Sequence, residues 1–243
     1  MLAFSSPFDE TAVDFLETLD VPAYKIASFE NTDWPLLRRV AATGKPVIMS
    51  TGASQLSEIA EAVQILREAG CKDLILLKCT STYPATPENT NLRTLPHFQQ
   101  LFPDCLVGLS DHTMGVGAAV AAVALGACAV EKHVTLRRAD GGVDSAFSLE
   151  PAEVAQLVTE TERAWQSLGQ VQYGVQRAEQ NSRLYKRSLY VAQDIKAGDL
   201  FTKENLRVVR PGDGLPPRYY DQVLGKPARQ DLKASTPLTW EAL

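Results

Sequence analysis

Two histidines stand out as candidate ligands of a divalent metal ion. His112 follows the apolar segment 106–109, and His133 lies at the end of the apolar segment 129–134; we predict that both segments are strands of a parallel sheet. Because one β/α unit separates the histidines, both imidazoles should reach the same rim and face one cavity. Neutral imidazole nitrogens suit a divalent transition metal. Two imidazoles leave coordination positions for water or substrate, which is typical of a catalytic metal site.

Acidic neighbours favour this interpretation over the alternative of two hydrogen-bonded structural histidines. Asp111 directly precedes His112, and Glu131 lies two residues before His133. Carboxylates in such places orient imidazole rings or activate water. We therefore predict catalytic roles for Asp111 and Glu131. The remaining histidine, His97, lies in a helix-like segment, and we expect it to be a surface or packing residue.

Three lysines also end predicted strands, together with several hydroxyl groups: Lys25, Lys78 and Lys132. Their ammonium groups could hold a phosphate and a carboxylate. One desolvated lysine could instead form a Schiff base as an aldolase nucleophile. The plainest interpretation is that all three extend from strand edges into solvent, and composition does not separate these alternatives.

Two glycine-containing loops could supply further substrate contacts. Residues 140–148 form a polar loop after the last predicted strand, and such loops often bind substrate, although this one could be a simple connection. Arg210 begins the turn Arg-Pro-Gly-Asp-Gly, which would present its guanidinium group rigidly. The guanidinium group could bind an anionic substrate with two hydrogen bonds. Alternatively, the segment is an ordinary surface turn.

The elements that position these residues indicate an α/β fold. Up to about residue 168, short apolar runs alternate with amphipathic helical periodicity, giving about six strands that begin with 2–6. Reactive residues follow every strand, which favours a (β/α)₈ barrel over a doubly wound sheet, and no GxGxxG or Walker sequence is present. Since a barrel needs eight strands, we expect the front of the barrel to be missing.

The chain divides by pattern into a partial barrel, a connection and a small β-rich domain. We place the partial barrel at residues 1–171, the linker at 172–187 and the small domain at 188–243. The small domain contains an internal sequence repeat, because residues 193–202 align with residues 230–239. Such a repeat predicts two pseudo-twofold halves.

Composition excludes several classes of protein. Of the 243 residues, 45% are hydrophobic and 22% charged, as in ordinary globular proteins, and the net charge of -5 argues against a nucleic-acid partner. No apolar run approaches the ~20 residues that a membrane helix needs. The first residues lack an export leader, so we expect a cytoplasmic protein. The four cysteines lack CxxC spacing, which favours buried thiols over disulfides or zinc.

An ordered series of short motifs resembles the sialic-acid synthase family over essentially the whole chain. The motifs are SSPFD at 5–9, YKIAS at 24–28, STG at 50–52, KCTSTYP at 78–84, GLSDHT at 108–113 and EKHVT at 131–135. The tail, with RPGDG at 210–214, resembles the family's antifreeze-like (SAF) domain. Within the family, residues 140–151 are more similar to pseudaminic acid synthases than to N-acetylneuraminate or legionaminate synthases.

The resemblance implies an incomplete TIM barrel of about six β/α units followed by a SAF domain. It implies condensation of phosphoenolpyruvate with an open-chain 2,4-diacetamido-2,4,6-trideoxy hexose, releasing phosphate and giving pseudaminic acid. His112 and His133 would bind Mn²⁺ or Mg²⁺, and Glu131 and Asp144 would assist proton transfer. The implied substrate-binding residues are Ser6, Lys25, Ser28, Ser50, Ser81, Tyr83, Ser110 and Arg210. Arg210 would come from a second subunit, because the family forms homodimers with exchanged SAF domains.

One departure from the family bears on activity. Family members carry two further β/α units before the SSPFD motif, whereas Met1 lies after both. We therefore expect a truncated reading frame or one half of a split protein, with little activity of the chain alone. The alternatives are an N-acetylneuraminate or legionaminate synthase, or an inactive fragment that acts as a binding or dimerisation module.

Overall fold

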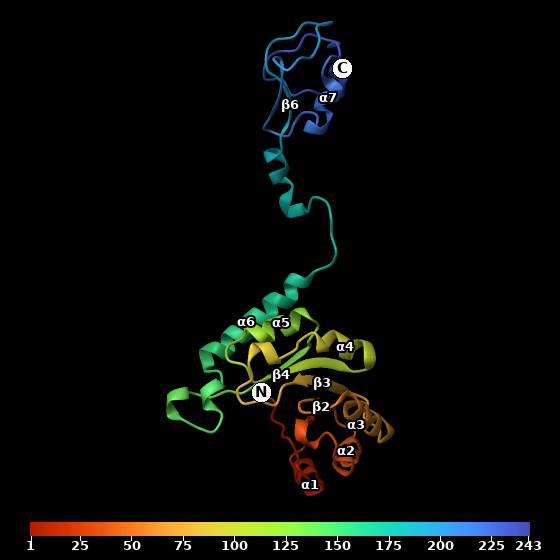
Figure 1. The fold of residues 1–243 in the computed structure, drawn as a ribbon, viewed down its shortest axis with the longest axis vertical. Coiled ribbons are helices and arrows are strands. Elements are labelled where there is room, and N and C mark those ends of the chain that lie inside the picture. Colours follow the sequence, from red (N-terminus) through yellow and green to blue (C-terminus); the bar gives the residue numbers. More distant parts are fainter. The chain divides into compact units, whose positions relative to one another are not determined.

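The computed structural model describes residues 1–243 and contains two compact units (Figure 1). The first unit comprises Met1–Gln170 and the second Val171–Leu243. None of the helices combines the length and apolar character needed to cross a bilayer.

The first unit is built on a five-stranded parallel sheet whose strands lie in chain order. This order is that of a barrel wall, in which each strand pairs with the next one along the chain. The strands are β1 (Tyr24–Ile26), β2 (Val47–Ser50), β3 (Leu74–Cys79), β4 (Leu106–Asp111) and β5 (Ala129–Lys132). Sequence and structure therefore agree on a partial barrel of β/α units.

Six α-helices connect and cover the strands, and α1 packs on α2, α2 on α3, and α5 on α6 (Figure 1). Asp9 caps α1 by accepting a hydrogen bond from the Ala12 amide at 2.7 Å, and Asp33 caps α2 in the same way. The helices are α1 (Glu10–Thr18), α2 (Trp34–Ala41), α3 (Leu56–Glu68), α4 (Thr94–Leu101), α5 (Gly117–Ala124) and α6 (Pro151–Leu168). Single 3₁₀ turns lie at Ser28–Glu30, Pro87–Asn89, Arg138–Asp140 and Ser145–Phe147.

The two faces of the sheet differ in character. Alternate residues of β1 to β4, such as Tyr24, Val47 and Leu74, are buried in one apolar core with the helices. The residues between them point to the opposite, inner face, where Leu106 is 59% exposed. The inner face is thus apolar at the amino ends of the strands, and its polar residues gather at the carboxyl ends.

The expected first strand at residues 2–6 does not form, so the prediction of about six strands was one too many. A single backbone hydrogen bond, from the Lys25 amide to the Ser5 carbonyl at 3.3 Å, joins this segment to β1. A strand needs a ladder of such bonds. With only one, the segment stays extended but unpaired, and β1 and β5 are the edges of the sheet.

The second unit has a small core around Leu189, Phe201 and Leu238. Its strands β6 (Ser188–Val191) and β7 (Leu206–Val209) are antiparallel. One α-helix, α7 (Tyr220–Val223), is joined by 3₁₀ turns at Arg177–Glu179, Asn181–Tyr185, Pro217–Tyr219 and Trp240–Ala242.

The structure explains the internal sequence repeat of residues 193–202 and 230–239. Its two copies pair through an antiparallel bridge between Ile195 and Leu232. Each aspartate accepts bonds from the other copy: Asp231 from Lys196 at 2.6 Å, and Asp194 from Lys233 at 2.7 Å. The equivalent backbone amides, of Ala197 and Ala234, bond the same two aspartates. The repeated residues therefore form a reciprocal, pseudo-twofold clamp.

Candidate active site

Polar side chains from both edge strands meet on the inner face of the sheet. The Lys25 ammonium group on β1 lies 3.6 Å from the Glu131 carboxylate on β5. A flat five-stranded sheet would separate its edges by about 19 Å, because strands lie about 4.8 Å apart. The ion pair therefore requires a sheet curved as in a barrel wall, and this curvature creates the site.

Ser110 completes this group from β4. In the sheet register it lies beside Glu131, and its hydroxyl donates a 2.6 Å hydrogen bond to the Glu131 carboxylate. Burial lowers the pKa of Lys25, and the attraction of Glu131 opposes that shift. The site thus holds an ammonium, a carboxylate and a hydroxyl within reach of one bound molecule.

The inner face also presents a buried hydroxyl that has no partner. Ser50 ends β2 on this face, and its Oγ is buried without a hydrogen bond to any protein atom. An unpaired buried hydroxyl costs about 1–3 kcal/mol, which a ligand can recover. Ser28 lies nearby and accepts a 3.0 Å bond from the Gly52 amide.

Gly52 permits this convergence because it lacks a side chain. A β-carbon at position 52 would overlap the Ser81 hydroxyl and crowd Ser28 and Cys79. The turn after β2 can therefore pass close to all three only with glycine there.

The two candidate metal ligands come together at the ends of β4 and β5. The ring centroids of His112 and His133 are 5.2 Å apart. His112 is buried, and its Nδ1 donates to the Thr80 carbonyl at 3.0 Å. His133 is partly exposed, with its Nδ1 3.5 Å from the Asp144 carboxylate. Phe147, whose ring centre is 5.1 Å from His133, packs beside the pair.

These contacts fit a divalent cation held by two imidazoles. Each histidine uses Nδ1 for a carbonyl or carboxylate, the arrangement that orients metal-binding histidines and leaves Nε2 free. No group of three His, Cys, Asp or Glu side chains is placed to hold a metal ion. The remaining positions would therefore belong to water or substrate.

Electrostatics distinguishes the two imidazoles. Burial alone would lower the pKa of His112, but bonds to Cys79 and to the Thr80 carbonyl outweigh it, so the pKa is raised. Burial, followed by repulsion from His112, lowers the pKa of His133. Burial would raise the pKa of Cys79, yet hydrogen bonds from His112 and neighbouring serines lower it to about 7. His112 is the more basic ligand of the pair.

Comparison with known proteins shows the family of the chain. Residues 1–173 match the NeuB family, and residues 186–243 match the SAF domain. The pseudaminic acid synthase of Campylobacter jejuni is 42% identical over 233 residues, covering 96% of this chain and 68% of that protein. The chain belongs to the NeuB family. Its carboxyl-terminal part is a SAF domain.

Other relatives of this NeuB-family chain are named for related products. The N,N'-diacetyllegionaminic acid synthase of Campylobacter jejuni is 39% identical over 94% of this chain and 69% of that protein. The human N-acetylneuraminate-9-phosphate synthase is 36% identical over 91% of this chain and 62% of that protein. The relatives thus share the synthesis of nonulosonic acids but differ in the sugar.

Solved structures agree with this assignment. A spore coat polysaccharide biosynthesis protein of Bacillus subtilis superposes with a TM-score of 0.68 at 31% identity, covering the whole of this chain and 73% of that chain. The N-acetylneuraminic acid synthetase of Leptospira borgpetersenii gives 0.70 at 37% identity, covering 75% of this chain and 63% of that chain.

The NeuB-family structure gives Asp111 a different place from the catalytic one that we predicted. Its side chain is completely buried and pairs at 2.7 Å with Lys132, whose side chain is only 4% exposed. The second carboxylate oxygen accepts the Thr113 amide at 2.8 Å. Strand alternation turns residue 111 away from the inner face that carries Ser110. Asp111 therefore braces the ends of β4 and β5 and does not face the site.

The same alternation separates the three lysines that we grouped as one anion site. Lys25 points to the inner face, whereas Lys132 is held by Asp111 on the helix side. Lys78 shares its side of β3 with the core residues Leu74 and Leu76. Only Lys25 therefore reaches the candidate site.

The remaining predicted residues differ in their surroundings. The Ser81 hydroxyl lies 3.7 Å from the Cys79 sulfur, and the exposed Tyr83 ring lies 4.4 Å from His112 between ring centres. Ser6 is partly buried in the segment that joins β1 through Ser5. Arg210 is exposed in the second unit.

Two residues of the site, Cys79 and Phe147, escaped the sequence prediction. Cys79 was interpreted only as a buried thiol, yet it lies beside Ser110 in the sheet register. Its place after Lys78 carried the signal, because adjacent strand residues point to opposite faces. Phe147 lies in the loop that was predicted to bind substrate.

Proposed function

We propose that this chain supplies the synthase site that condenses phosphoenolpyruvate with an open-chain 2,4-diacetamido-2,4,6-trideoxy hexose, forming pseudaminic acid. The observation that carries the proposal is the meeting of Lys25, Glu131, Ser110 and the two histidines on one curved inner face. Similarity to pseudaminic acid synthases supports the choice of sugar.

Phosphoenolpyruvate would bind through Lys25 and the serine hydroxyls. It carries a phosphate and a carboxylate, for which an ammonium group and hydroxyl donors are suitable partners. Lys25 is almost completely buried, so its charge would act in a poorly solvated place. The unpartnered Ser50 hydroxyl would gain a hydrogen bond from the same ligand. Ser6, Ser28 and Ser110 lie on the segments that flank this region.

The acceptor aldehyde would approach from the histidine side. Mn²⁺ or Mg²⁺ between His112 and His133 would polarise the aldehyde oxygen. Carbon 3 of phosphoenolpyruvate would bond to the aldehyde carbon, water would add to carbon 2, and phosphate would leave. Glu131 would hold or deliver a proton at this point, since it accepts the Ser110 hydroxyl and is partly open to solvent. Asp144 would orient His133.

The bound substrate would be enclosed by Tyr83, Ser81 and Arg210. The Tyr83 ring lies tilted against His112, and Tyr83 is about half exposed and available to a sugar. We assign Arg210 to the site of the partner subunit in a domain-swapped homodimer. Mixing Arg210→Ala and His112→Ala chains tests this, because one of the two heterodimer sites would carry neither change. Recovered activity supports exchange; no recovery despite proven subunit mixing contradicts it.

Acceptor-dependent phosphate release tests the proposed reaction. The chain, restored with the two β/α units that precede the SSPFD motif in the family, is incubated with phosphoenolpyruvate, Mn²⁺ and either the diacetamido-trideoxy hexose or N-acetylmannosamine, which an N-acetylneuraminate synthase would need. We expect release with the diacetamido sugar and a nine-carbon keto acid by mass spectrometry. Glu131→Gln should abolish it. Release only with N-acetylmannosamine would assign the site to another nonulosonate.

The Schiff-base alternative is tested separately. Lys25 is the inner-face lysine, and its ammonium donates to the Ile26 carbonyl at 3.0 Å beside Glu131. Borohydride reduction in the presence of pyruvate would trap a covalent adduct only if Lys25 were a nucleophile. We expect no adduct by mass spectrometry.

A further inference from the structure

The three strand-end lysines differ in their counter-charges. Lys25 has Glu131, and Lys132 has Asp111. Lys78 has no acidic partner: its ammonium donates to the Cys79 carbonyl at 2.7 Å and to the Thr80 hydroxyl at 2.8 Å. Lys78 is half-buried and, of the three strand-end lysines, it is the one without a carboxylate partner.

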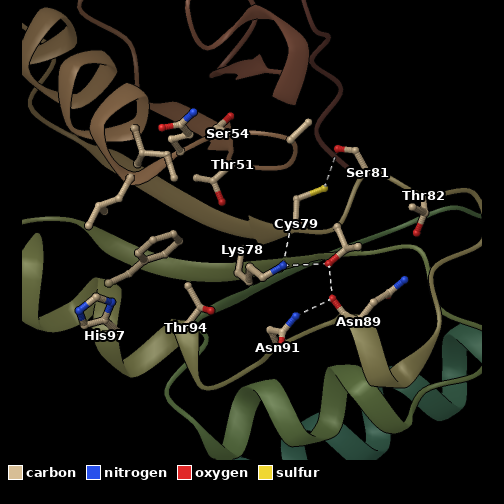
Figure 2. A pocket seen from close by; sticks show the side chains of 16 residues that line it. Thr51, Ser54, Lys78, Cys79, Ser81, Thr82, Asn89, Asn91, Thr94 and His97 are labelled. Atoms are coloured by element: carbon tan, nitrogen blue, oxygen red, sulfur yellow. Dashed lines mark hydrogen bonds between the residues drawn. The ribbon is translucent and has the colours of Figure 1, made fainter.

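Lys78 opens onto a cavity of about 930 Å³ between α3 and α4. Figure 2 shows Thr51 and Ser54 on one side of this cavity, and Asn91, Thr94 and His97 on the other. The lining is rich in hydroxyl and amide groups, has an apolar wall, and includes no aspartate or glutamate. Its size suits a small metabolite.

The charge balance indicates the class of ligand. Burial is the main cause that lowers the pKa of Lys78; attraction to the Cys79 sulfur opposes this shift, and no carboxylate does. Keeping this charged group away from water costs free energy unless an anion is nearby. A phosphate or carboxylate group would supply that charge, and a sugar's hydroxyls would match the hydroxyl and amide lining.

We propose that this cavity binds a small hydroxylated oxyanion, a sugar phosphate or a sugar acid, with its charged group at Lys78. The inner-face residue Cys79 and Ser81 also border this cavity. The charged end of the cavity goes beyond the proposed function, because Lys78 lies on the helix side of β3 with the core residues Leu74 and Leu76. It takes a ligand different from phosphoenolpyruvate at Lys25.

Thr80 connects this cavity to the candidate active site. Its hydroxyl accepts the Lys78 ammonium and donates to the Asn89 carbonyl, while its own carbonyl accepts the His112 ring. An anion that draws Lys78 away from Thr80 would alter the residue that orients His112.

Calorimetric titration with glucose 6-phosphate and with glucuronate tests the proposal. We expect at least one probe to bind the wild-type chain, and Lys78→Met to weaken it about tenfold or more through loss of a charge-assisted bond. Lys72→Met is the matched control, since Lys72 is exposed two residues before the same strand; it should leave affinity unchanged. The preferred probe identifies phosphate or carboxylate as the bound group.

Two further variants separate this site from the reaction site. Asn91→Asp keeps Lys78 but adds a carboxylate to the lining, so it should also abolish binding. Lys25→Met, with folding checked by circular dichroism, should leave probe binding intact even if the proposed phosphoenolpyruvate site is wrong. The proposal would be overturned if the probes bound wild type and Lys78→Met with equal affinity, or if Lys25→Met lost probe binding instead. It would also be overturned if neither probe bound the wild-type chain.

Discussion

Charged side chains of the second unit pair with one another at the surface, whereas the first unit buries polar groups that no protein atom satisfies. In the SAF domain, Asp194 and Asp231 each accept a lysine and a backbone amide from the opposite repeat. The buried side-chain atoms without partners all lie in the first unit: Glu30 Oε2, Ser50 Oγ and Thr113 Oγ1. Matched surface charges describe a scaffold, and unmatched buried groups mark where ligands are expected.

The largest effect should come from breaking the buried pair in the first unit. Asp111→Ala leaves Lys132 charged and almost unexposed, which should cost about 3–5 kcal/mol of unfolding free energy. Urea unfolding in a Trp240→Phe background, followed through Trp34 and Trp165, reports on this unit alone. The double variant Asp111→Leu/Lys132→Met should recover most of the loss. A loss below about 1 kcal/mol in Asp111→Ala would show that the pair is not isolated from water.

A smaller structural effect should follow Gly52→Ala. The added methyl group would overlap Ser81 and crowd Ser28, so about 1–3 kcal/mol of stability should be lost. Gly117→Ala is the matched control, because a β-carbon there meets nothing within 4 Å. Equal unfolding midpoints for the two variants would contradict the close convergence around Gly52.

Metal binding should weaken as the pH falls. Imidazole binds a cation only when neutral, and the raised pKa of His112 keeps its proton competitive to higher pH than an ordinary histidine. Free Mn²⁺ measured by electron paramagnetic resonance should therefore rise as the pH decreases through the pKa of His112. His97→Gln should leave the curve unchanged, and His112→Gln should remove binding at every pH. A pH-independent affinity would exclude a histidine-bound ion.

The smallest effect should come from the surface clamp of the second unit. Lys196 and Lys233 are largely exposed, so removing either charge should leave the unfolding midpoint almost unchanged. Phe201→Ala, a deletion in the core of the same unit, is the contrasting control and should destabilise it strongly. A large effect of Lys196→Ala would mean that the clamp stabilises the fold as much as the core does.

Sequence patterns predicted the parallel order of strands, the repeat in the small domain and the proximity of His112 and His133. These depend on apolar periodicity and on the spacing of one β/α unit. Strand alternation places neighbours such as Lys78 and Cys79 on opposite faces, but the pattern alone does not say which of the two points inward. In the structure Lys78 and Asp111 point away from the inner face, and Cys79 points into it. The failure of 2–6 to pair depends on neighbours that local sequence does not specify.

Relaxation of the ³¹P signal of phosphoenolpyruvate by Mn²⁺ tests the central claim most directly, namely that Lys25 and the histidine pair belong to one site. Mn²⁺ held by His112 and His133 should enhance the relaxation of phosphate bound at Lys25, because both would lie on the same inner face. Either Lys25→Met or the His112→Gln/His133→Gln double change should remove the enhancement, while Lys72→Met should keep it. Enhancement that survives in both the Lys25 and the histidine variants, or that is absent from a wild-type chain binding both Mn²⁺ and phosphoenolpyruvate, would contradict the account.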